Sequence, residues 1–145
     1  MENQEKIVSF NIVRIQTEQF AIIPESYQEN APFEINHELA FGIDKTHQLV
    51  LVRKTARYLH PHRPPFMLIT VVCYFRIEDN SWNDLKVENT DQIQLPRNFA
   101  IHLVMTTVGT LRGVLHTKTE QTPFNQLIIP PVNTLDLVPD NVIFL

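Results

Sequence analysis

The most apolar part of the chain, residues 66–77, limits the folds that are open to it. The segment reads FMLITVVCYFRI and is rich in β-branched and aromatic residues, which favours a strand. Alternate positions give it two apolar faces, with Phe66, Leu68, Val72 and Tyr74 on one and Met67, Ile69, Val71, Cys73 and Phe75 on the other. A strand of this kind needs cover on both faces, so we expect it to lie inside a sheet.

Three further strands are predicted before it, and the short connections between them favour antiparallel pairing. Residues 6–23 form a long strand whose apolar positions change parity near residues 12–13, which predicts a β-bulge there. Residues 48–59 return after a turn at 42–47, so they should pair as a hairpin with the preceding strand. That preceding strand has the alternating set Phe33, Ile35, His37, Leu39 and Phe41. Residues 60–65 contain three prolines and form a stiff connection.

One helix is predicted, over residues 96–121. Its apolar seam recurs at helical spacing and consists of Ile101, Val104, Val108, Leu111 and Leu115. Beside the seam runs a stripe of small residues, Thr106, Gly109, Thr110, Gly113 and Thr117. Such a helix has mediocre propensity and must be held by packing, either on the chain's own sheet or on a second subunit. We expect one of the two surfaces to form a subunit contact that includes Val104, Val108, Gly109, Leu111 and Gly113.

The fold class that follows is α+β, a four-stranded antiparallel sheet followed by one long helix. Residues 1–145 are expected to form a single domain with a core at about residues 6–133 and an extended C-terminal segment at 123–145. Residues 78–94 read as a polar loop. One helix covers one face of such a sheet, so the other apolar face should meet a partner, a ligand, or the C-terminal segment folded back over it.

Composition and charge exclude several classes of function. The net charge is −4 and the Lys and Arg residues are scattered, with the densest stretch at Arg53, Lys54 and Arg57, so nucleic-acid binding is not expected. No apolar run approaches the ~20 residues that a membrane span needs, so no membrane insertion is expected. The polar start of the chain is unlike a secretory signal, and a single cysteine excludes an internal disulfide. Together these features predict a cytoplasmic protein.

No set of residues in the sequence has the spacing of a catalytic or metal site. His60 and His62 could chelate a metal on an extended chain, but Arg63 opposes a cation and no further ligand is near. Cys73 lies among apolar residues, which favours an inert, buried thiol. His102 and His116 have no nucleophile or acidic partner at a fixed offset. We therefore expect no enzymatic activity, no catalytic residues, no metal and no cofactor.

Short motifs at both ends of the chain point to one family. Val8-Ser9-Phe10 opens the first strand as the Val-Ser-Phe of the SecB family of export chaperones does. Residues 124–133, FNQLIIPPVN, are similar to that family's Phe-Pro-x-Leu-x-Leu-x-Pro-Val-Asn, and Leu111-Arg112 stands near its Ala-Arg. With the order of the predicted elements, the chain resembles this family over residues 6–133. Residues 134–145 depart from it, because they lack the family's second helix and polar tail, and the main helix lacks its Arg-Gly ending.

The resemblance implies a non-catalytic chaperone that holds unfolded or extended apolar polypeptides, in protein transport or with a dedicated client. It also implies a homo-oligomer, a dimer or tetramer. The residues expected to contact the client on the apolar sheet face are Phe33, Phe41, Phe66, Leu68 and Tyr74. The alternative is a small-ligand or partner-binding domain that kept the fold without chaperone activity. A long open groove would favour the chaperone, and a closed pocket would favour the ligand-binding domain.

Overall fold

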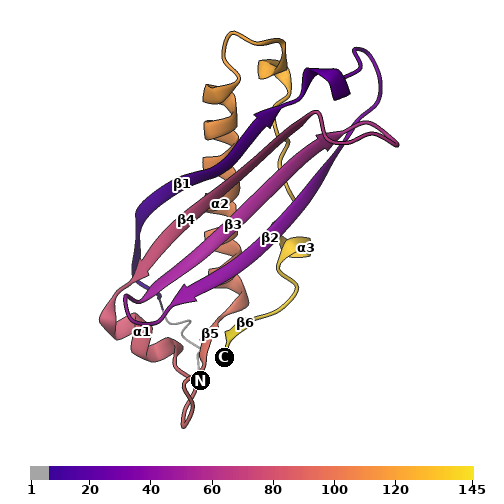
Figure 1. Cartoon of the computed structure of the whole chain (residues 1–145). Helices are drawn as coiled ribbons and strands as arrows, with labels where there is room; N and C mark the ends of the chain where they lie inside the picture. Colours follow the sequence, from indigo (N-terminus) through magenta and orange to yellow (C-terminus); the bar gives the residue numbers. More distant parts are fainter. Residues whose placement is uncertain (1–6) are drawn as a thin grey trace.

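The computed structural model describes residues 7–145 and contains a four-stranded antiparallel sheet with one long helix on one of its faces (Figure 1). The elements of the sheet and the long helix are β1 (Phe10–Ile22), β2 (Glu34–Asp44), β3 (Leu49–Leu59), β4 (Met67–Ile77) and α2 (Arg97–Lys118). The shorter elements are η1 (Pro24–Ser26), α1 (Asp79–Leu85), β5 (Ile93–Leu95), η2 (Pro123–Gln126), α3 (Thr134–Leu137) and β6 (Val142–Phe144). The predicted α+β class is confirmed.

The strands of the sheet lie in the order β1-β4-β3-β2, so the most apolar strand is in the interior, as predicted. β1 pairs with β4 from Phe10 opposite Ile77 to Ile22 opposite Met67. Its register shifts twice, between Ile12 and Arg14 and between Thr17 and Gln19. The predicted bulge is therefore confirmed, and a second irregularity follows it, which lets a long edge strand follow the twist of the sheet.

The long helix α2 packs its apolar seam on β3 and β4. The five seam residues are at most 8% exposed, and Ile69, Val71 and Cys73 beneath them are fully buried. Thr107 is also fully buried on this side, and its hydroxyl donates to the Leu103 carbonyl at 2.8 Å, so it leaves no unsatisfied group. The seam thus packs against the chain's own sheet, and the stripe of small residues lies toward the outside.

Residues 78–94 are more ordered than their polarity predicted. α1 buries Trp82 and Leu85, which stand one helical turn apart and so share one face. The Ser81 hydroxyl accepts a hydrogen bond from the Ser9 amide at 2.8 Å, which joins α1 to the start of β1. β5 pairs with β6 in a separate two-stranded sheet. The expectation of a loop was wrong because Trp82, Leu85 and Ile93, three apolar residues spread through a polar sequence, are buried and anchor it.

The C-terminal segment lies on the same side of the sheet as α2 (Figure 1). The Arg112 guanidinium donates from α2 to the carbonyls of Ile129 and Pro130, at 2.8 and 3.3 Å. The Tyr58 hydroxyl donates from β3 to the Leu127 carbonyl at 3.2 Å. The segment is extended over much of its length, with η2, α3 and β6 within it. It does not fold over the sheet face that α2 leaves uncovered.

Candidate functional site

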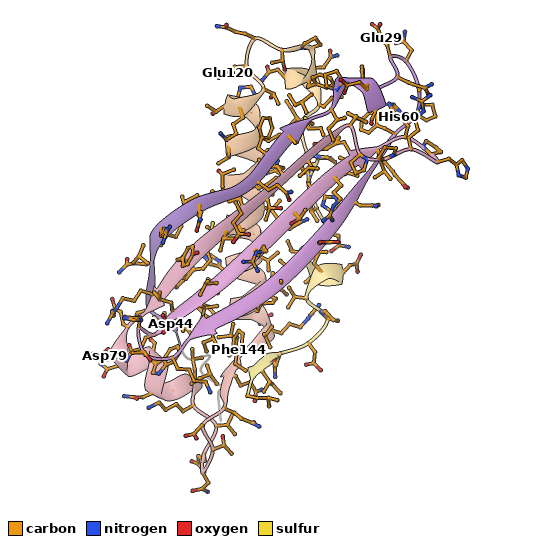
Figure 2. All side chains as sticks on the ribbon, viewed as in Figure 1. Glu29, Asp44, His60, Asp79, Glu120 and Phe144 are labelled. Atoms are coloured by element: carbon orange, nitrogen blue, oxygen red, sulfur yellow. The ribbon has the colours of Figure 1, made fainter. Side chains whose placement is uncertain are left out.

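The sheet face turned away from α2, here called the open face, is covered by polar side chains. Arg53 on β3 forms a two-pronged ion pair with Glu18 on β1, with N–O distances of 2.8 and 2.9 Å. Arg57 pairs with Glu38 at 2.8 Å. The mutual hydrogen bonds lower the pKa of Glu18 and raise that of Arg53. Figure 2 shows side chains along the length of all the strands of the sheet.

Apolar residues of β4 lie beneath this layer. The Tyr74 hydroxyl donates to Gln16 at 3.0 Å, and the Arg14 guanidinium stands 5.2 Å from the centre of the Tyr74 ring. Val72, on the same face, is fully buried. The expectation that this face is bare and apolar was wrong, because long side chains from the neighbouring strands cover the apolar residues of β4.

The opposite side of the sheet carries a half-buried apolar row on its edge strand. We call this row the β2 stripe; it consists of Ile35, His37, Leu39, Phe41 and Ile43. The register places these residues opposite the buried, α2-facing residues of β3. β2 pairs only with β3, so the backbone groups along its outer edge have no partner strand among the described residues. The short helix α3 packs against α2, on the same side of the sheet as this row.

A charged residue lies directly behind the β2 stripe. Lys54 is 1% exposed, and its Nζ atom is 2.8 Å from His37 Nδ1 and 3.1 Å from the Thr55 carbonyl oxygen. Burial lowers the pKa of Lys54 to about 8. The pKa of His37 is also lowered, first by burial and then by the adjacent ammonium group. The basic composition of residues 53–57 did not distinguish Lys54 from its exposed neighbours, but its inward parity between Val52 and Ala56 was a usable signal.

An aromatic cluster packs at the end of the sheet where the β2 stripe begins. It contains Tyr27, Phe33, Tyr58, Phe66 and Phe124, whose rings contact one another. Phe66 is fully buried in its centre, whereas Phe33 is 42% exposed. Beside Phe33 lies a shallow hollow of about 460 Å³, which Pro32, Glu34, Pro61 and His62 complete.

The structure divides the five residues predicted to contact a client between three places. Phe41 lies on the α2-facing side within the β2 stripe, and Phe33 directly precedes β2 and contacts the aromatic cluster. Leu68 and Tyr74 lie on the open face, partly covered. Phe66 has no exposed surface in the chain, so its grouping with Leu68 and Tyr74 is corrected. It precedes the first residue of β4 and turns into the aromatic cluster.

The five residues predicted for a subunit contact are also divided. Val104, Val108 and Leu111 are at most 5% exposed and belong to the core of the chain, which corrects their assignment to a subunit surface. Gly109 and Gly113 are exposed, and a methyl group added to either would meet no atom within 4 Å. A shallow hollow of about 410 Å³ lies along this side of α2, lined by Thr110, Gly113, Val114, Thr117 and Lys118.

His60 and Cys73 are both occupied within the fold. His60 is 1% exposed; its Nδ1 donates to the Pro32 carbonyl at 2.8 Å, and its Nε2 accepts from the Gln28 amide at 2.9 Å. Both ring nitrogens are therefore engaged and cannot join His62 in binding a metal. Cys73 is fully buried, and burial raises the pKa of its thiol. Residues 7–145 contain no group of three or more His, Cys, Asp and Glu side chains arranged to hold a metal ion.

A further hollow lies at the other end of the sheet from the aromatic cluster, near the beginning of α2. Its volume is about 520 Å³, and its apolar lining comes from Ile7, Val8, Leu85, Pro96 and Phe99, with Ser81, Asp84 and Asn98 as polar members. This size is within the range of small-ligand sites. Within residues 7–145, every helix is too short or too polar to cross a bilayer.

Comparison with known proteins gives a likeness of fold. No protein-family model matches the chain, and no curated protein matches it in sequence. Among solved structures, it is similar to a SecB-like chaperone from Mycobacterium tuberculosis in complex with a ChAD peptide from the HigA1 antitoxin. The match has 12% sequence identity and a TM-score of 0.51, and it covers 85% of this chain and 90% of that chain. At this identity the likeness shows the fold alone, and the chain has a SecB-like fold.

Proposed function

We propose that the protein binds extended apolar segments of other polypeptides, without catalysis, along the β2 stripe. The observation that carries the proposal is the combination of a half-buried apolar row and an unpaired strand edge on β2. The fold gives further support, because the similar chaperone was solved with a bound peptide.

Strand addition explains how such binding works. An extended segment beside β2 pairs with its backbone N–H and C=O groups, and this pairing does not depend on the sequence of the segment. Alternate side chains of the segment then lie against Ile35, Leu39 and Phe41, with Phe33 next in line. Affinity for one segment is weak, and it rises when an oligomer presents several sites to one chain.

We also propose a homo-oligomer that forms through the outer side of α2. Gly109 and Gly113 are not required for packing within the protomer, since space is open beside both. Small residues on an exposed helix allow a second backbone to approach closely. A chaperone in protein transport or one with a dedicated client both fit this arrangement, and a cytoplasmic location is part of the proposal.

The hollow of about 520 Å³ near Phe99 favours a second candidate, the binding of a small apolar ligand. The two candidates use different residues of the molecule, so substitutions separate them. Phe99→Ala should affect only a ligand in the hollow, and substitutions in β2 should affect only a polypeptide.

A titration with a labelled unfolded polypeptide tests the main proposal. Phe41→Gln removes an apolar side chain from the β2 stripe, and Ala40→Gln makes a matched change one residue away on the open face. We expect Phe41→Gln to weaken binding several-fold and Ala40→Gln to leave it unchanged. Equal affinities of the three proteins would reject the β2 stripe as the site, and failure of the unsubstituted protein to bind would reject the function.

A further inference from the structure

A positive charge that has no ion-pair partner among residues 7–145 lies on β3, directly behind the centre of the β2 stripe. Lys54 is 1% exposed, and both hydrogen-bond partners of its ammonium group, His37 Nδ1 and the Thr55 carbonyl, are neutral acceptors. Among residues 7–145, the carboxylate that acts on it is that of Glu38. Glu38 lies on the open face and forms an ion pair with Arg57 at 2.8 Å.

Burying a charge without a counter-charge is costly, and buried lysines in proteins are usually paired. An apolar residue at position 54 would pack between Val52 and Ala56 without this cost. A bound anion would supply the negative charge that this buried ammonium group lacks.

His37 connects this charge to the surface. An ammonium group can only donate hydrogen bonds, so the Nδ1 atom of His37, 2.8 Å away, must be the acceptor. The proton of the neutral imidazole is then on Nε2, which becomes a donor. The His37 ring is half-buried, and no hydrogen bond to its Nε2 is formed within residues 7–145. The pair thus offers a positively polarised N–H group to whatever lies against the β2 stripe.

We propose that His37 and Lys54 bind a carboxylate side chain of the polypeptide held on β2. This inference rests on the proposed function and names the class of segment that it prefers: an Asp or Glu with apolar residues two positions before and after it. The spacing follows from strand geometry, since side chains of a paired strand alternate between faces. When the carboxylate faces His37, its apolar neighbours on the same face lie against Ile35 and Leu39.

The preference for a carboxylate comes from charge complementarity at a site that is partly shielded from solvent. A charge-assisted hydrogen bond between Nε2–H and a carboxylate is stronger than one to a neutral amide. The buried ammonium behind the ring adds attraction that solvent screens only partly. A lysine at the same position of the segment meets a like charge and is rejected.

The experiment uses three labelled peptides that differ at one central position, with Glu, Gln or Lys between apolar residues at two-residue spacing. Binding to the full-length protein is measured by fluorescence anisotropy. We expect the Glu peptide to bind about tenfold more tightly than the Gln peptide, and the Lys peptide to bind most weakly.

Lys54→Met should remove the preference for Glu over Gln, so that the two peptides bind with similar affinity. Arg53→Met is the matched control, because it removes a cation from the next residue of β3 but on the open face. It should keep the preference. His37→Phe retains a half-buried ring and should also remove the preference for Glu over Gln. It provides the test if Lys54→Met does not fold.

The outcomes separate the two proposals. If none of the peptides binds, the proposed function fails, and this inference fails with it. If all three bind with equal affinity, polypeptide binding stands and the carboxylate preference is overturned. A preference that persists in both Lys54→Met and His37→Phe also overturns it. If free N-acetylglutamate amide binds saturably and as tightly as the Glu peptide, His37 and Lys54 form a site for a small carboxylic acid and not for a polypeptide.

Discussion

His37 Nδ1 on β2 lies 2.8 Å from Lys54 Nζ on β3, and both side chains belong to the side of the sheet that α2 covers. This contact joins the edge strand to the buried part of the sheet through two groups that both carry a positive charge at low pH. It makes the stability of the protein depend on pH in a direction that follows from the two lowered pKa values.

The first prediction concerns Lys54→Met. Burial lowers the pKa of Lys54 from 10.5 to about 8, so the unfolded chain binds more protons between these pH values and stability rises with pH there. At pH 7 the lysine is charged in both states, and the folded state bears the full cost, on the order of 3 kcal/mol. Lys54→Met should therefore raise the free energy of unfolding at pH 7 and have a smaller effect near pH 10. Urea denaturation at both pH values measures it; a variant less stable at pH 7 would contradict the reasoning.

The second prediction concerns His60, which holds the connection between β1 and β2 to the end of β3. His60→Phe preserves the ring stack on Phe66, whose centre is 4.9 Å away, but loses the hydrogen bonds to Gln28 and Pro32. We expect a loss of roughly 1–3 kcal/mol in the free energy of unfolding, because the amide and the carbonyl lose their partner. His62→Phe, at an exposed position two residues on, is the control and should change stability little.

Several of these features could be read from the sequence, and others could not. The alternation of apolar and polar residues and the placement of the prolines predicted the four strands. Such a pattern arises because each strand of this sheet either buries one face or lies in the interior of the sheet. The seam from Ile101 to Leu115 predicted α2 for the same reason. The parity of Val8, Phe10 and Ile12 against Val13 and Ile15 also predicted the first bulge.

The open face could not be predicted in the same way. Apolar residues of β4 are covered there by Arg53, Glu18 and Arg57, which come from strands on both sides, and such cover depends on the strand order. The burial of Lys54 was not predicted either: its parity with Val52 and Ala56 indicates an inward position, but lysine is rarely found in a core. The place of the C-terminal segment depended on hydrogen bonds to backbone carbonyls, which leave no mark in the sequence.

The third prediction tests the outer side of α2 as a subunit contact. Gly113→Leu should weaken self-association by on the order of 1–3 kcal/mol through overpacking at the interface. The protomer should keep its fold, because no atom lies within 4 Å of the added Cβ position. Sedimentation over a range of concentrations measures the effect, and Gly113→Ala should give a smaller change in the same direction. A wild-type protein that sediments as a monomer at micromolar concentration would remove the proposal.

The last prediction concerns two arginines that hold different parts of the C-terminal segment to α2. Arg112 donates to the carbonyls of Ile129 and Pro130, and Arg97 donates to those of Val138 and Leu135, at 2.7 and 3.0 Å. The methylene stems of both side chains can be kept in Arg→Met variants, so the loss is mainly that of the charged hydrogen bonds. Arg112→Met should speed backbone hydrogen exchange at residues 127–129, and Arg97→Met should speed it at 135–141.

Each variant serves as the control for the other, because both remove one arginine from the same helix. Faster exchange that is confined to the expected part shows that the segment is fastened at two separate points. It also tests whether this segment limits access to the β2 stripe: if it does, Arg112→Met should strengthen binding of an unfolded polypeptide. Exchange that rises along the whole segment in both variants would show instead that residues 127–141 open as one unit.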